Sequence, residues 1–204
     1  MKTILVTGFE PFGEIVQSPS QALVEEIERR AAILEGVSLI TDILPVIYEK
    51  AVPRIQTLIQ EANPDIVLSF GVAAQREAVN LERVALNLKD TPQPDNAGYQ
   101  PDGELIDQSA PLAYFSNLPL AAIRNHLQKR DIQTVISNHT GAYLCNAVFF
   151  AAAHQVQTSG GEVGYGFVHI PLVPVKTEDH KALTIPTLAE AVIEIMQRLA
   201  DSGF

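Results

Sequence analysis

The chain has 204 residues, of which 47% are hydrophobic and 19% are charged, an ordinary balance for a globular protein. Its formal charge is −10 and it has no run of basic residues, which argues against nucleic acid or an anionic membrane as a partner. One cysteine excludes an internal disulfide framework, and no stretch reaches the ~18 apolar residues of a membrane span. The first apolar run is too short for a signal peptide. We therefore expect one acidic domain over residues 1–204, located in the reducing cytoplasm.

The first half of the chain alternates predicted strands and helices. Residues 3–7 form a continuous apolar run, which is typical of a strand covered on both faces. The period-two pattern of residues 83–88 favours an exposed or antiparallel edge strand. In chain order, the patterns predict a strand at 3–7, a helix at 20–34, a strand at 37–46, a helix at 48–61, and strands at 65–70 and 83–88.

Residues 90–108 interrupt this alternation with three prolines and two glycines, as in lids and binding loops. The pattern then resumes with a helix at 118–130, a strand at 134–137, a helix at 143–157, a strand at 163–169 and a helix at 185–200. Such alternation predicts an α/β fold with a mostly parallel sheet. In these sheets, sites gather beyond the carboxyl ends of the strands. We place four segments there: 8–9, 71–72, 138–145 and 169–171.

Cys145 is a candidate nucleophile because it lies where a strand-to-helix turn enters a helix. Free backbone N–H groups and the helix dipole at such a position favour the thiolate. A nucleophilic cysteine also needs a histidine and an orienting polar group close in space. The alternative role for a lone cysteine is that of a small buried hydrophobe.

Two of the five histidines are candidates for the general base. His169 ends an apolar strand and precedes Ile170-Pro171, where the ladder of hydrogen bonds must stop. His139 lies in the loop before Cys145. Of the remaining three, His126 is expected to be solvated, His154 to be packed or on the surface, and His180 to be exposed.

Three acidic residues are candidates to orient the imidazole, and composition does not choose among Glu10, Glu82 and Asp95. For Glu82 the alternative is a surface ion pair with Arg83, which contributes little. No cysteine or histidine pair has metal-ligand spacing, and no Gly-rich phosphate loop is present. We therefore expect neither a metal nor a cofactor.

Five ordered segments span most of the chain: TGFEPFG (7–13) followed by PS (19–20), ERVALN (82–87), PDNAGYQP (94–101), SNHTGAYLCN (137–146) and GFVHIP (166–171). Together they resemble the motifs of the pyroglutamyl peptidase I family, also called pyrrolidone-carboxylate peptidases. The resemblance implies a three-layer α/β/α sandwich around a mostly parallel, mixed sheet. It also implies a homotetramer.

The same resemblance implies a cysteine peptidase that removes a pyroglutamyl residue from peptides with a blocked N-terminus. By motif position, Cys145 would be the nucleophile, His169 the general base and acid, and Glu82 the residue that orients the imidazole. Two phenylalanines would sandwich the flat lactam ring, and four further residues would complete the substrate pocket: Phe9, Phe12, Val72, Gln93, Tyr143 and Leu144.

Several pocket positions depart from the family pattern: Ser18, Val72, Pro92, Gln93 and His139. Pro92 stands where the family commonly has an arginine linked to oxyanion stabilisation, so we expect weaker stabilisation of the oxyanion unless Lys89 or His139 reaches the site. Gln93 adds hydrogen-bonding capacity where a hydrophobic side chain is usual, and such changes redirect specificity. The alternatives are a weak or inactive homologue that binds a small lactam, amide or peptide N-terminus, and hydrolysis of an unrelated amide.

Overall fold

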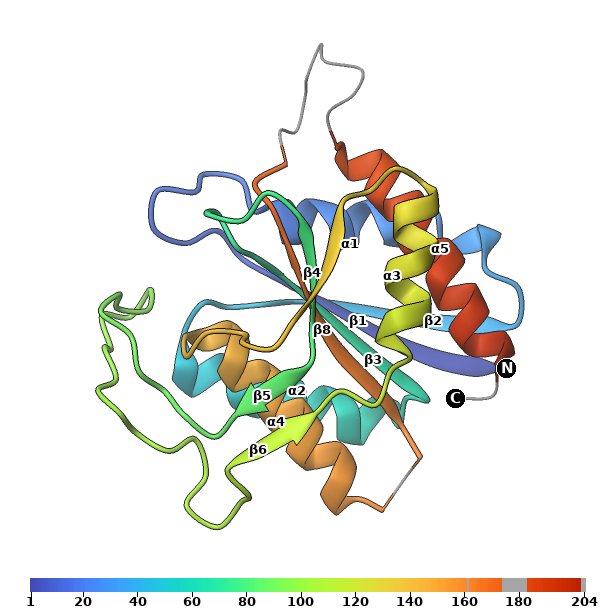
Figure 1. Cartoon of the computed structure of the whole chain (residues 1–204). Helices are drawn as coiled ribbons and strands as arrows, with labels where there is room; N and C mark the ends of the chain where they lie inside the picture. Colours follow the sequence, from blue (N-terminus) through green and yellow to red (C-terminus); the bar gives the residue numbers. More distant parts are fainter. Residues whose placement is uncertain (161, 174–182, 203–204) are drawn as a thin grey trace.

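A six-stranded mixed sheet runs through the centre of the molecule in the order β2-β1-β3-β8-β4-β7 (Figure 1). The computed structural model describes residues 1–160, 162–173 and 183–202. The first four strands in this order are mutually parallel, whereas β4 is antiparallel to β8 and parallel to β7. The strand bounds are β1 Lys2–Phe9, β2 Val37–Leu44, β3 Ile66–Val72, β4 Val79–Glu82, β7 Thr134–Ser137 and β8 Gly164–Ile170.

Helices cover both faces of this sheet, which confirms the predicted three-layer sandwich (Figure 1). One face packs against α1 (Pro19–Arg29), α3 (Leu120–Lys129) and α5 (Ile185–Asp201). The other face packs against α2 (Tyr48–Ala62) and α4 (Leu144–Thr158). None of the helices in the described ranges has both the length and the apolar character needed to cross a bilayer.

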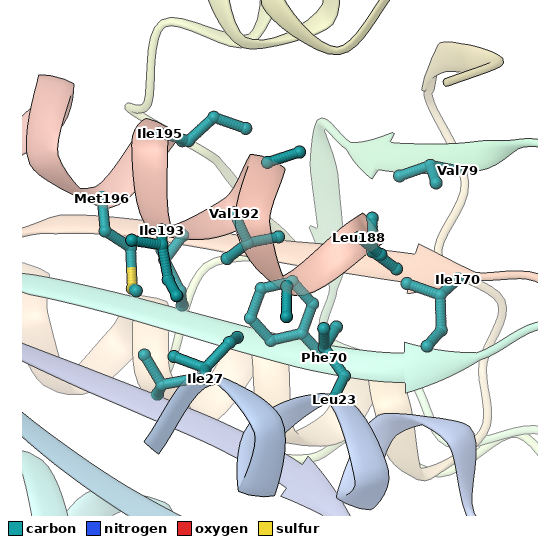
Figure 2. Close-up of a cluster of buried hydrophobic side chains, with 14 of the residues drawn as sticks. Leu23, Ile27, Phe70, Val79, Ile170, Leu188, Val192, Ile193, Ile195 and Met196 are labelled. Carbon is teal, nitrogen blue, oxygen red and sulfur yellow. The ribbon is translucent and has the colours of Figure 1, made fainter. Parts of the chain in front are cut away.

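The apolar side chains form two buried clusters, one on each side of the sheet. Figure 2 shows the first cluster, in which Leu23 and Ile27 of α1 face Phe70 of β3, with residues of α5 closing the other side. Because successive strand residues point to opposite faces, Val168 and Ile170 join this cluster. Phe167 packs in the cluster beside α4, so the same alternation places His169 on the α4 face.

The strand predicted at 83–88 is present as the shorter β5 (Val84–Leu86), which pairs antiparallel with β6 (Ala113–Phe115) in a separate two-stranded sheet. The strand β4, which precedes it in the main sheet, was not predicted. The antiparallel edge character expected for this segment is therefore found in β5. The sequence pattern missed β4 because Asn80 and Glu82 are polar, although both are buried in the structure.

The direction of β7 also differs from the expectation of a common carboxyl edge. β7 is parallel to β4 and thus opposite to β8, so the segment after Ser137 does not start at the carboxyl end of β8. The loop 138–143 still lies close to the site. Ser137, which precedes it, pairs with Glu82, and Glu82 pairs with Phe167, two residues before His169. Elsewhere the predicted elements are present, except that the helix expected at 20–34 ends at Arg29 and is followed by a short 3-10 turn, Ala31–Ile33.

Candidate active site

Cys145 is the second residue of α4, and its sulfur lies directly against the backbone of β3. The N–H groups of a helix's first turn have no partner within the helix, so those around Cys145 are free to bind a developing anion. A Cβ atom added at Gly71 would lie 2.9 Å from the Cys145 sulfur and 2.8 Å from the ring of Phe167. A glycine at position 71 is therefore needed for the thiol to fit.

The start of α4 is fixed by Asn146, the residue after the thiol. Its buried amide accepts a hydrogen bond from the Leu86 N–H (2.9 Å) and donates to the carbonyls of Leu86 (2.8 Å) and Leu88 (2.9 Å). The hydroxyl of Thr140 donates to the Val84 carbonyl (2.8 Å) just before the helix. These bonds hold the thiol-bearing turn against β5 and the segment that follows it.

A buried hydrogen bond joins His169 and Glu82, with Nδ1 2.8 Å from Oε1. The register of β4 against β8 pairs Asn80 with His169 and Glu82 with Phe167, so Glu82 and His169 are diagonal neighbours on one face of the sheet. The Glu82 side chain is fully buried. Because Nδ1 donates to the carboxylate, Nε2 is the ring nitrogen left for proton transfer.

The other two acidic candidates lie elsewhere. Glu10 is exposed. Asp95 is buried but accepts hydrogen bonds from the N–H groups of Tyr48, Ala97 and Tyr99, so it shapes a turn and the start of α2. Of the three acids that the sequence offered, Glu82 is the one in contact with His169.

Cys145 and His169 line the same cleft, which has a volume of about 490 Å³. The six residues predicted to form the substrate pocket all line this cleft: Phe9, Phe12, Val72, Gln93, Tyr143 and Leu144. The ring of Phe12 lies 6.3 Å from that of Tyr143, whose hydroxyl donates to the Pro94 carbonyl (3.1 Å). That bond connects the loop after Pro92 to Tyr143, the residue that precedes the first turn of α4.

The sequence did not predict seven further residues that line the cleft: Val46, Ala73, Ala74, Gln75, Arg76, Thr91 and Thr140. For Arg76 a signal was available, because it follows the carboxyl end of β3 by four residues, close to Val72. Val46 is the last residue of the strand predicted at 37–46, and Thr91 lies in the loop 90–108 that was expected to be a lid or binding loop, but neither side chain by itself marks a site.

Neither Lys89 nor His139 lines the cleft in place of the missing family arginine. The Lys89 ammonium donates to the Tyr99 hydroxyl (3.0 Å) and to Glu104 (2.9 Å), away from the cleft. The exposed His139 accepts the Gly141 N–H at Nδ1 (2.9 Å). Arg76 is the cationic side chain that lines the cleft among the described residues.

The two remaining positions that depart from the family pattern do not line the cleft. Ser18 is buried and accepts the Gln21 N–H (3.4 Å) as the N-cap of α1, and its hydroxyl lies 3.0 Å from that of Ser20. Pro92 is exposed, between two residues that do line the cleft, Thr91 and Gln93.

Three histidines lie outside the cleft or outside the described residues. His126 was expected to be solvated, but its Nε2 lies 2.9 Å from Glu194 and the side chain is half-buried. His154 is packed, stacked on the ring of Phe150, with Nδ1 2.8 Å from the Tyr114 hydroxyl. His180 falls outside the described residues.

Burial raises the pKa of the Cys145 thiol to about 12, and the nearby Glu82 carboxylate adds to this effect. A backbone N–H and the Arg76 guanidinium act in the opposite direction but are outweighed. The predicted effect of the helix N-terminus on the thiol is therefore present in direction but is outweighed by burial. At neutral pH the thiol keeps its proton, so attack on a carbonyl requires a base that removes it.

Comparisons with known proteins agree with this geometry. The model of the pyroglutamyl peptidase family matches residues 2–200. A pyrrolidone-carboxylate peptidase of Brevibacillus brevis is 36% identical over 195 residues, covering 94% of this chain and 90% of that protein. One of Vibrio vulnificus is 37% identical over 198 residues, covering 96% and 92%.

Solved structures give the same result. Pyrrolidone carboxyl peptidase from Thermococcus litoralis superimposes with a TM-score of 0.89 at 31% identity, covering 98% of this chain and 94% of that one. The enzyme from Fervidobacterium islandicum gives a TM-score of 0.90 at 32% identity, covering 98% and 99%. The resemblance seen in the five sequence segments is thereby confirmed, and the chain belongs to the pyroglutamyl peptidase family.

Proposed function

We propose that this chain is a cysteine peptidase that removes a pyroglutamyl residue from the N-terminus of peptides. Cys145 acts as the nucleophile, His169 as general base and acid, and Glu82 as the residue that orients the imidazole. The observation that carries the proposal is the buried His169–Glu82 hydrogen bond (2.8 Å) at the wall of the cleft that Cys145 also lines. Nucleophilic acyl transfer requires a thiol, a base that can take its proton and a group that orients the base, and Cys145, His169 and Glu82 supply these.

In the first half of the reaction, Nε2 of His169 takes the thiol proton as the sulfur of Cys145 bonds to the pyroglutamyl carbonyl carbon. The oxyanion that forms is stabilised by backbone N–H groups in the first turn of α4, each of which is typically worth ~2.7–4 kcal/mol. The carbon–nitrogen bond then breaks, and His169 returns its proton to the leaving amine. The products of this half are a shortened peptide and a thioester on Cys145.

In the second half, a water molecule gives a proton to Nε2 of His169 and adds to the thioester carbonyl. The carbon–sulfur bond breaks, pyroglutamate leaves, and the proton returns to the sulfur. Glu82 holds the Nδ1–H throughout and stabilises the transient imidazolium. The pKa of the Cys145 thiol, raised to about 12 by burial, makes the base necessary in the first step.

The pocket fits a small, flat, partly polar ring. Phe9, Phe12 and Tyr143 supply aromatic surface along the cleft, and Val72 and Leu144 supply aliphatic surface. Gln93 is exposed at the cleft wall, and we assign its side-chain amide to hydrogen bonding with the lactam. A polar wall residue of this kind discriminates against rings that lack the matching amide.

The test is fluorophore release from pyroglutamyl-aminomethylcoumarin by purified protein under reducing conditions. Cys145→Ala and His169→Ala are expected to lose turnover with the circular dichroism spectrum unchanged. His154→Ala removes another half-buried imidazole, outside the cleft, and should retain activity. Absence of turnover in the folded wild type, with pyroglutamate still binding in calorimetry, would support the binding homologue instead.

We also propose that the chain forms one domain over residues 1–204, that it works as a homotetramer, and that it resides in the reducing cytoplasm. The family match over residues 2–200 supports the first point. Leu112 and Phe115 are 77% and 62% exposed, which supports an interface around β6. The free thiol of Cys145 supports a reducing compartment. Analytical sedimentation tests this interface: the wild type should be a tetramer, and a variant carrying both Leu112→Glu and Phe115→Glu should dissociate. A tetramer in both would show that the interface does not include β6.

A further inference from the structure

One carboxylate oxygen of Glu82 accepts hydrogen bonds from both His169 and Arg76. Oε1 of Glu82 lies 2.8 Å from Nδ1 of His169 and 2.6 Å from Nη1 of Arg76. Arg76 reaches this point from the connection between β3 and β4, and its Nη2 also donates to the His139 carbonyl (3.0 Å). Its side chain is 33% exposed, whereas that of Glu82 is fully buried. The guanidinium of Arg76 therefore lies between the buried Glu82–His169 pair and the solvent.

The charge of Glu82 needs this contact. A buried carboxylate is costly unless a cation and hydrogen bonds compensate for it, and a neutral imidazole supplies no charge. Cys145 on α4 keeps its proton because burial raises its pKa to about 12. Arg83, the next residue along the chain, donates instead to the Asn138 side chain (2.7 Å). Among the described residues, Arg76 is the arginine or lysine in ion-pair contact with Glu82.

We propose that Arg76 is a positioning residue that sets the pH range of the enzyme by holding the Glu82 carboxylate ionised and bonded to His169. This inference rests on the proposed function, because it assigns Arg76 to the pair that serves Cys145. Removing a cation from a coupled carboxylate–imidazole pair increases the affinity of the pair for a proton, whichever of the two binds it. The proton-free pair, which is the form that can act as a base, then appears only at higher pH.

Direct binding of the substrate is the competing role, because Arg76 also lines the cleft. The two roles differ in their kinetic consequences. A positioning residue changes kcat and the acid limb of the pH profile with little effect on KM. A residue that contacts the ground-state substrate changes KM and leaves the acid limb in place.

The experiment compares Arg76→Gln, Arg76→Lys and Arg83→Gln with the wild type, using pyroglutamyl-aminomethylcoumarin from pH 5 to 9. Arg83→Gln is the matched control, since it removes the same charge one residue from Glu82 without a contact to the carboxylate. We expect the acid limb of kcat/KM in Arg76→Gln to move up by about one pH unit or more, as opposite charges at this range typically shift a titration by 1–3 units. Arg76→Lys should restore the wild-type limb, and Arg83→Gln should leave it in place.

A rise in KM with an unmoved acid limb in Arg76→Gln would overturn the proposal, as would a limb in Arg76→Lys displaced as far as in Arg76→Gln. A second readout does not depend on turnover. In the Cys145→Ala background, nitrogen-15 resonances of the His169 ring should titrate at higher pH when Arg76→Gln is added. An unchanged midpoint overturns the role of Arg76. An inactive wild type with a shifted midpoint contradicts the proposed function alone.

Discussion

Replacing Gly71 by Ala tests whether the sulfur of Cys145 is held directly on the backbone of β3. The added methyl group would lie 2.9 Å from the sulfur and 2.8 Å from the Phe167 ring, whereas ordinary contacts at such a carbon are 3.4–4 Å. The thiol must therefore move by roughly 0.5 Å or more relative to β3. Since a 1 Å misplacement of a reacting group can cost about 10²-fold, we expect kcat/KM to fall by about 10- to 100-fold.

The same clash should lower stability. Overpacking a tight core site costs about 1–3 kcal/mol. For a chain of this size that corresponds to a fall in Tm of about 2–12 °C. Strain in the backbone is not the cause, because Gly71 does not have a positive φ.

Gly166→Ala is the matched control, because Gly166 lies on the neighbouring strand β8 and its added methyl group would meet Leu118 at 2.5 Å, away from the thiol. This variant should lose stability and keep the kcat/KM of its folded fraction. The assays are hydrolysis of pyroglutamyl-aminomethylcoumarin and thermal unfolding followed by circular dichroism. Wild-type kcat/KM in Gly71→Ala, or equal losses of activity in the two variants, would refute the claim that contact with β3 places the sulfur.

Asn146→Ala leaves three backbone groups of Leu86 and Leu88 without their side-chain partner. Chemical denaturation should therefore show that the free energy of unfolding falls by about 2–4 kcal/mol, whereas the exposed control Asn125→Ala should change it little. Alkylation of Cys145 by iodoacetamide should accelerate about tenfold per pH unit from pH 7 to 9, because the thiol with a pKa raised to about 12 is far from full ionisation there; a plateau near pH 7 would contradict this. Glu82→Gln should lower kcat by about 10²-fold or more and leave KM nearly unchanged, because the amide no longer stabilises the imidazolium of His169. Equal damage to folding and to rate in Glu82→Gln would count against its orienting role.

Local sequence determined the elements that depend on neighbouring residues. The apolar run at Ile66–Val72 predicts a strand covered on both faces, and every residue of β3 is buried in the structure. The Ala- and Phe-rich segment after Tyr143 predicts the helix that begins at Leu144. Cys145 at a helix start and His169 near a strand end follow from these two patterns, because a residue's place within an element is a local property.

The residue pattern by itself did not decide which acid contacts His169, and the tertiary structure shows why it is Glu82. Composition leaves Glu10, Glu82 and Asp95 as equivalent candidates, and only the family resemblance points to Glu82. The physical reason is the antiparallel register of β4 against β8, which places Glu82 diagonally across from the imidazole. The position of Arg76 on the same carboxylate oxygen depends on the turn between β3 and β4. Register and turn geometry are set by hydrogen bonds between segments far apart in the chain, so the periodicity of either segment does not contain them.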